Sequence, residues 1–230
     1  MGPMRRISLA TGIAALALLT APAWAGRPLI TEDAGVLEAG QCEIESYLAR
    51  LHQPGLTLQW AQLGCGAGLH TQLTAGAGRE LSSSGHMTVV AASGKTALRQ
   101  LTGEQAGIAI AYATLGGNHI DHLRHEASEV KAVLTIPQDQ WLLHANAGWV
   151  RNYAYHADKT IWALALERQH AFAAVDLMGE IFGDDRGTPF AQLAGRWTII
   201  PARLVVDASW GAQINDIKTR QATIGLKLAF

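Results

Sequence analysis

The stretch QATIGLKLAF, residues 221–230, alternates almost without error between apolar side chains and polar or small ones. Side chains on a β-strand point to opposite faces with a period of two, so this segment has one apolar face and one polar face. A transmembrane barrel strand has this pattern, with its apolar face in lipid and its polar face towards the lumen. A soluble β-sandwich strand can share it, so this segment alone leaves both folds open.

The other end of the chain favours the membrane reading. The pair Arg5-Arg6 precedes an apolar run over residues 7–19, and Ala23 and Ala25 form the small-x-small pattern of a cleavage site. These features predict a secretory signal peptide over residues 1–25. Its apolar run is short for a transmembrane helix, and no later run approaches the roughly 18 apolar residues that such a helix needs.

The charge of the chain argues against a nucleic-acid partner. The 230 residues include 18 basic and 19 acidic ones, and two of the basic residues lie in the predicted signal peptide. The mature protein is therefore slightly acidic and has no strong basic field.

Short alternating segments of about ten residues, bounded by Gly, Pro, Asn and Asp, fill the rest of the chain. An even number of strands lets both ends lie in the periplasm, with short turns there and longer loops outside. We identify twelve, at residues 41–51, 56–64, 69–78, 86–98, 106–115, 126–136, 141–151, 160–168, 171–182, 190–199, 203–212 and 221–230.

The predicted fold is therefore all-β: a transmembrane antiparallel up-and-down β-barrel of about 12 strands over residues 41–230. Residues 26–40 precede the first strand and form either a periplasmic segment or a plug in the lumen. Trp141 and Trp149 share one face of one strand and are eight residues apart. The distance between them along the membrane normal is then close to the height of an apolar band, whose two edges carry the aromatic girdles. Trp60 is the exception, because it falls in the middle of a strand.

The segment GRPLITEDAG at residues 26–35, followed by Gly40 and a strand with Glu43 and Glu45, resembles the opening of an outer-membrane barrel family named for the phenol meta-cleavage degradation pathway. A weaker likeness runs through residues 95–117, where the family often has a Pro-Thr-Gly element and this chain has Ala-Thr-Leu-Gly. Members are usually described as candidate transporters. The resemblance implies an uptake role for a small, hydrophobic or aromatic molecule.

Twelve strands give a backbone radius of about 12 Å, so inward side chains leave at most a narrow passage. Strand parity places both signs of charge inside, and we expect a ladder of mixed charge across one wall. Such a ladder either holds the barrel together or selects a solute. The lumen and selectivity candidates are Glu43, Glu45, His144, Asp176, Glu180, Arg196, Arg203, Asp207 and Lys227.

Cys42 and Cys65 flank the first hairpin, and export to an oxidising compartment permits a disulfide. If Leu56, Leu58 and Trp60 face lipid, however, Cys65 points inward and Cys42 outward. A bulge near residues 64–66 would then be needed to bring the two onto one face.

A predicted outer loop at residues 118–126 contains His119, His122 and His125 with acidic neighbours, a set that could bind zinc or copper. A solvated loop that happens to be rich in histidine explains the same residues. We expect no cofactor and no enzymatic activity.

The sequence thus predicts a monomeric barrel in the bacterial outer membrane that passively transports a small molecule. Its expected partners are outer-membrane lipid, the transported solute and the barrel-assembly machinery, which would recognise the last strand ending in Phe230. Two alternatives remain open: a non-conducting structural or surface-binding barrel, and an outer-membrane enzyme that uses loop His and Asp residues.

Overall fold

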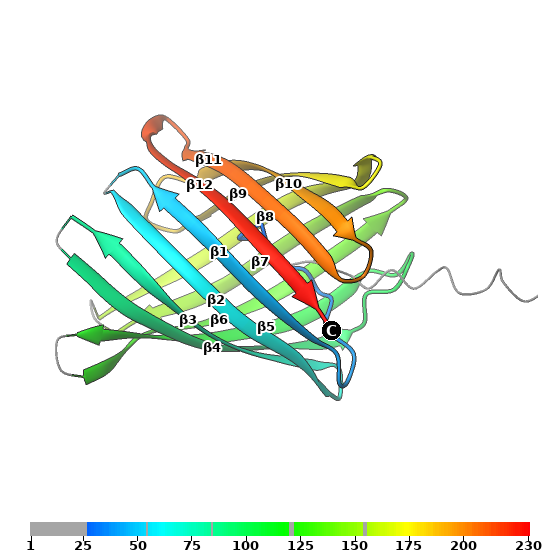
Figure 1. Ribbon diagram of the computed structural model, residues 1–230, viewed down its shortest axis with the longest axis horizontal. Helices are drawn as coiled ribbons and strands as arrows, with labels where there is room; N and C mark the ends of the chain where they lie inside the picture. Colours follow the sequence, from blue (N-terminus) through cyan, green and yellow to red (C-terminus); the bar gives the residue numbers. More distant parts are fainter. Residues whose placement is uncertain (1–26, 54, 84, 120–121, 154–155) are drawn as a thin grey trace, which may run out of the picture.

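The computed structural model describes residues 27–53, 55–83, 85–119, 122–153 and 156–230. Twelve β-strands in this part of the chain close into a single barrel (Figure 1), as predicted. The strands are β1 (Cys42–Leu51), β2 (Leu56–Gly68), β3 (Thr71–Ser82), β4 (Gly85–Arg99), β5 (Gly107–His119), β6 (His122–Gln138), β7 (Trp141–Asn152), β8 (Ala157–Phe172), β9 (Val175–Asp184), β10 (Phe190–Ile200), β11 (Leu204–Gln213) and β12 (Asp216–Ala229).

Each strand pairs antiparallel with its neighbour in sequence, and β1 closes the ring against β12 with Glu43 opposite Ala229 and Leu51 opposite Gln221. Closure leaves no free sheet edge, so the strands satisfy one another's backbone groups as a membrane requires. The start of β1 and the end of β12 lie at the same end, which we call the proximal end; the opposite end is the distal end. No helix within the described residues is long and apolar enough to cross a membrane.

The two faces of the wall differ in chemistry as the alternation predicts. In β12 the side chains of Ile224 and Leu226 are exposed on the outside, whereas Lys227 between Leu226 and Leu228 is buried on the inside. Moving a leucine or isoleucine side chain from water into an apolar phase is worth about 1.5–3 kcal/mol. The outer face repeats such residues around the ring, so lipid is its favourable environment.

The tryptophans fit this division, with one exception. Trp141 and Trp149 are exposed on the outer face of β7, in the arrangement predicted for an aromatic girdle. Trp60 instead points into the lumen, where its indole N–H donates to Gln62 at 2.9 Å. A Cβ at Gly76 or Gly78 on β3 would collide with the indole ring, so these glycines provide the space for it.

The inward position of Trp60 resolves the predicted conflict between the two cysteines. The condition that produced the conflict, with Leu56, Leu58 and Trp60 facing lipid, is not met, because Trp60 pairs with the inward Tyr47 in an unbroken β1–β2 register. In that register Cys42 lies directly opposite Cys65, with their Cα atoms 4.1 Å apart, and a disulfide joins them. No bulge between β1 and β2 is needed.

Several distal hairpins extend further than predicted. The segment expected to be a His-rich loop at residues 118–126 is mostly strand, because β5 continues to His119 and β6 begins at His122. Similarly, β12 begins at Asp216 rather than at residue 221. Polar residues in these stretches indicate strands that continue beyond the apolar band, and do not mark the ends of strands.

Candidate functional site

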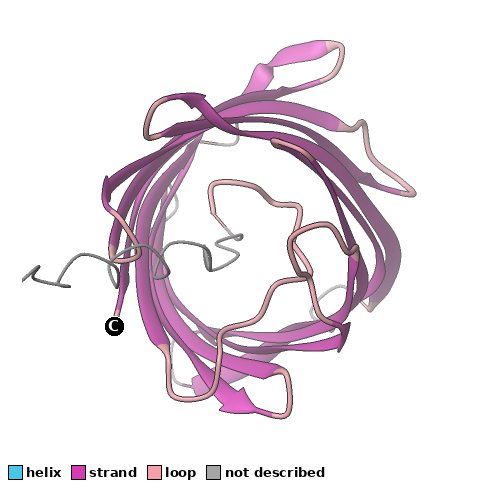
Figure 2. Cartoon of the chain, turned by 90° about the vertical axis from the view of Figure 1, so that its right-hand side faces the viewer, coloured by secondary structure: helices cyan, strands magenta, loops and turns pink. Residues whose placement is uncertain are grey.

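Residues 27–40, the segment before β1, lie inside the ring of strands (Figure 2). We call them the lumen segment. Its last residues join the wall at the proximal end, where Ala39 forms an isolated parallel bridge with Gly66 and the Gly40 N–H donates to the Gly66 carbonyl at 3.1 Å. A side chain at Gly66 would overlap the backbone of Leu37 and Glu38, so only glycine permits this close approach.

The middle of the lumen segment is bound by Glu180 on β9. The Glu180 carboxylate accepts the backbone N–H groups of Ile30 and Thr31, both at 2.9 Å, and the Thr31 hydroxyl at 2.7 Å. Gln192 of β10 donates to the same carboxylate at 2.8 Å and to the Pro28 carbonyl at 3.1 Å. These donors offset the cost of holding a carboxylate away from bulk water.

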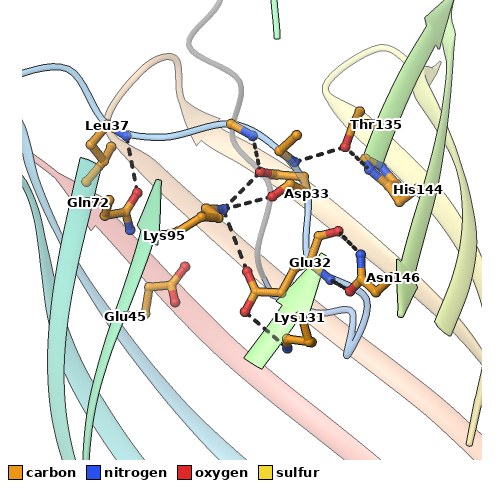
Figure 3. Close-up of polar contacts among 12 residues, drawn as sticks. Glu32, Asp33, Leu37, Glu45, Gln72, Lys95, Lys131, Thr135, His144 and Asn146 are labelled. Carbon is orange, nitrogen blue, oxygen red and sulfur yellow. Dashed lines mark hydrogen bonds and ion pairs between the residues drawn. The ribbon is translucent and has the colours of Figure 1, made fainter. Parts of the chain in front are cut away.

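Two acidic side chains of the lumen segment meet two wall lysines (Figure 3). Lys95 of β4 lies 3.0 Å from the Asp33 carboxylate and 3.6 Å from Glu32, while Lys131 of β6 lies 3.6 Å from the other oxygen of Glu32. Asn146 of β7 fixes the Glu32 backbone, accepting its N–H at 2.7 Å and donating to its carbonyl at 2.9 Å. The segment is thereby tied to three strands on one side of the barrel.

The electrostatics of Glu32 favour its ionised form. About a third of its side chain is exposed, but the group lies deep in the lumen, so removal from solvent alone would raise its pKa. The charges of Lys95 and Lys131, with their hydrogen bonds, outweigh that effect and hold the pKa of Glu32 below its usual range. The docked segment therefore binds best when this carboxylate is charged.

Arg27 anchors the other end of the segment to the opposite wall. Its guanidinium lies 3.2 Å from Asp207 of β11, donates to Thr223 of β12 at 3.1 Å and stacks over the Tyr47 ring at 3.8 Å. Its carbonyl accepts a hydrogen bond from Arg196 of β10 at 3.3 Å. Contacts at both ends and in the middle thus hold the segment across the lumen.

The wall carries its own buried ion pairs next to this segment. Arg196 donates to Glu167 at 3.1 Å and lies 3.7 Å from Asp176, and Glu167 lies 3.7 Å from the His144 ring. His144 is linked to the segment through Thr135, which shares a hydrogen bond with it at 3.0 Å and accepts the Ala34 N–H at 2.9 Å. Breaking one member of such a buried pair typically costs about 3–5 kcal/mol.

A second group of wall ion pairs lies on β1 and β12. Lys227 lies 2.8 Å from Glu45 and 3.2 Å from Glu43, and Gln62 donates to Glu45 at 2.6 Å. The predicted ladder is therefore not continuous. Arg196 pairs with Asp176, and Lys227 pairs with Glu43 and Glu45. Glu180 and Asp207 bind the lumen segment.

The structure places eight of the nine lumen candidates on the inner wall, all but Arg203. That residue is exposed in the proximal turn before β11, where its N–H donates to the Ile200 carbonyl at 3.0 Å. The prediction that Arg203 joins the charge ladder is wrong, because β11 begins one residue later than expected. Whether the eight inward candidates select a solute stays a prediction.

Lys95 was absent from the lumen candidates, although it binds the segment directly. Strand parity in residues 86–98 could have indicated its inward position. Its partners at residues 32 and 33 carry no periodic signal, because the segment has no regular secondary structure.

Of the three proposed metal ligands, only the side chain of His125 belongs to the described part of the chain. The side chains of His119 and His122 lie outside the described part, while the His125 ring contacts Thr114 at 2.9 Å and Ser128 at 3.0 Å. No group of three or more His, Cys, Asp or Glu side chains suited to a metal ion occurs in the described ranges.

Two cavities flank the lumen segment. The first, of about 410 Å³, is lined by the apolar inward side chains Ile161, Phe182 and Phe190, by Ile30 of the segment, and by polar groups that include Asn146 and Lys131. The second, of about 190 Å³, is polar and lies against β1 to β6, with Glu43, Gln62 and Lys95 in its lining. The first cavity is the more apolar of the two, and Ile30, Glu129 and Lys131 line both.

A closed antiparallel barrel with an apolar exterior, a charged lumen and a chain segment folded into it has the architecture of a transmembrane β-barrel. By sequence, the chain belongs to the family described as "Uncharacterised conserved protein UCP029691", which matches residues 13–230. The relation to the phenol meta-cleavage family is not confirmed by this match and stays a resemblance. No curated protein matches the sequence.

Among solved structures, the chain is similar to the KdgM porin in complex with disordered oligogalacturonate. That match has a TM-score of 0.60 and 6% identity and covers 82% of this chain and 99% of the other. The NanC porin matches with a TM-score of 0.54 and 6% identity and covers 81% of this chain and 98% of that one. At these identities the likeness shows the fold.

Proposed function

We propose that this chain is a bacterial outer-membrane barrel for passive transport of a small molecule with hydrophobic or aromatic character, and that the lumen segment is its plug. The observation that carries the proposal is the course of residues 27–40 through the lumen, bound to the wall by hydrogen bonds and ion pairs. Each such contact can be exchanged for water, and a typical hydrogen bond contributes only about 0.5–1.5 kcal/mol net. A segment held this way can leave without disturbing the strand pairing.

Several further features support the location. The exposed apolar outer face, the porin-like fold and the predicted signal peptide over residues 1–25, which lies outside the described residues, agree with export to the outer membrane. We further propose that the barrel-assembly machinery recognises β12 and the terminal Phe230, and that the barrel works as a monomer. The solute's hydrophobic or aromatic character rests on the family resemblance, and the absence of catalysis stays a prediction from the sequence.

One observation favours a second candidate, a non-conducting barrel. Asp33 is 1% exposed and pairs with Lys95 at 3.0 Å, so releasing the segment requires a buried ion pair to be broken. If that contact keeps the segment docked permanently, the barrel would serve as a structural or surface-binding protein.

Conductance across a planar bilayer separates the two candidates. We would compare the refolded mature protein with a variant that lacks residues 26–40. The control is Lys159→Met, which removes the ion pair between Lys159 and Asp184, 2.7 Å apart on the distal wall, and leaves the segment unchanged. The plug proposal predicts brief openings in the full chain and a large, steady conductance after deletion. Silence in both forms would overturn it and support the non-conducting barrel.

The deletion variant should also prefer cations. Around the segment, the described wall includes seven carboxylates and four cationic side chains, so the open lumen would carry excess negative charge. Reversal potentials in a salt gradient measure this preference. The seven carboxylates belong to Glu43, Glu45, Glu129, Glu167, Asp176, Glu180 and Asp207, and the four cationic side chains are Lys95, Lys131, Arg196 and Lys227.

A further inference from the structure

The cavity between the lumen segment and the distal loop after β9 has an apolar inner wall. Phe182 of β9 and Phe190 of β10 are a register pair, and their rings stack with centroids 5.6 Å apart. Ile161 of β8 adds a third apolar side chain to the lining. Most large inward side chains described above are polar or charged, so this patch departs from the rest of the inner wall.

The lumen segment contributes to the same cavity. Ile30 belongs to its lining, as it does to that of the polar cavity, and the residue is 52% exposed although it lies inside the barrel. The Ile30 backbone is fixed by the N–H bond to Glu180, so its side chain is presented to the cavity by a bound part of the segment. Gly187, Thr188 and Gln213 line the distal side.

The charged groups around the cavity have partners of opposite sign. Lys131 lies 2.7 Å from Glu129, and Asp184 lies 2.7 Å from Lys159. A charged molecule would therefore lose hydration without finding an uncompensated counter-charge. Asn146 can supply polar contact at one end of the space.

We infer that this cavity is a binding site for a small neutral molecule that has an apolar body and one hydrogen-bonding end, with the apolar body held between the Phe182–Phe190 pair and Ile30. The volume of about 410 Å³ lies within the range of small-molecule sites, which combine apolar walls with a few polar groups. This inference rests on the proposed transport function and adds a residue set and a charge class to it. Because Ile30 belongs to the plug, the bound molecule touches the element that must move.

A simpler explanation exists for the two phenylalanines. Cross-strand aromatic pairs stabilise neighbouring strands, and this pair could serve only to join β9 to β10. That explanation does not account for Ile30, which belongs to no strand and is about half exposed. Variants at Phe182 and Ile30 therefore separate binding from strand pairing.

The test uses three probes with the same body: cyclohexylmethanol, cyclohexanecarboxylate and cyclohexylmethylammonium. Binding to the full mature chain in lipid nanodiscs is measured by saturation-transfer NMR, with empty nanodiscs as the blank. We expect the neutral probe to bind about tenfold or more tightly than either charged one. Phe182→Ala and Ile30→Asn should each weaken its binding by about tenfold.

Ile181→Ala is the matched control, because Ile181 is the neighbour of Phe182 on β9 and faces outward, where it is 41% exposed. It should leave binding unchanged. Equal binding by wild type, Phe182→Ala and Ile30→Asn would overturn the site, as would tighter binding of a charged probe. Loss of affinity in Phe182→Ala alone would reduce the pair to a strand-joining role and also overturn it.

Conductance is recorded on the same preparations to keep the two proposals apart. Binding without conductance would contradict transport and leave the site standing. Conductance without binding of the neutral probe would contradict the site and leave the plugged transporter standing.

Discussion

Replacing Lys95 by methionine should release the lumen segment from the barrel. The Lys95 ammonium lies 3.0 Å from the Asp33 carboxylate, 3.1 Å from the Asp33 carbonyl and 3.6 Å from Glu32. Asp33 is 1% exposed, so Lys95→Met would leave it as a buried carboxylate without this counter-charge while the segment stays docked. Such a loss costs about 3–5 kcal/mol.

That cost acts on docking, because the released segment can place Asp33 in water. A penalty of this size lowers the docking equilibrium constant by about 10²- to 10⁴-fold. Two measurements follow the change: the open fraction of single channels, and cleavage of the segment after Glu32 and Glu38 by a glutamate-specific protease. Both should rise in Lys95→Met.

Lys159→Met is the control, since Lys159 pairs with Asp184 on the distal wall at 2.7 Å. It removes a lysine of the same kind and should change neither the open fraction nor the cleavage rate. If Lys95→Met behaves like this control, the contact between Lys95 and Asp33 does not hold the segment. If it lowers the unfolding temperature of the barrel without exposing the segment, the docking argument is also refuted.

Three further changes should act on the segment or on the hairpin beside it. Since the docked pKa of Glu32 is lowered, its contribution to docking is fully present above the ordinary glutamate pKa and is lost as the pH falls through the docked value; conductance should rise below about pH 4, and Glu32→Gln should flatten this rise. Gly66→Ala should loosen the segment at its proximal end, because the new Cβ would overlap backbone there, and the protease assay should detect this. Cys42→Ser with Cys65→Ser removes a cross-link between residues separated by 23 positions, so the free energy of unfolding should fall by about 3 kcal/mol in a urea titration while single-channel conductance stays unchanged.

The barrel could be predicted from the sequence because its strands follow one simple rule. A membrane fixes the polarity of the outer face at every second position, so segments such as residues 221–230 carry a strong signal. The same rule located the inward Glu45, Glu180 and Lys227. It failed at Arg203, because β11 begins one residue later than predicted and Arg203 therefore lies in the turn.

The contents of the lumen were harder to predict. Residues 27–40 have no periodic pattern, and their partners, such as Asn146 and Asp207, lie more than 100 positions away in sequence. Trp60 was also ambiguous, because aromatic side chains suit either face and only the glycines opposite it show which side has room. Strand alternation specifies the face of the wall on which each side chain lies, but it does not specify which inward side chains contact one another.

The position of the lumen segment at the start of the chain has a consequence for assembly. The segment is synthesised before every strand, yet many of its binding groups come from late strands, among them β9, β10, β11 and β12. It can therefore reach its final place only after most of the wall has formed. A strand that slipped by one residue would turn its polar side chains outward and remove them from the segment's reach. Docking of residues 27–40 would then be a late step that succeeds only in barrels whose register is correct.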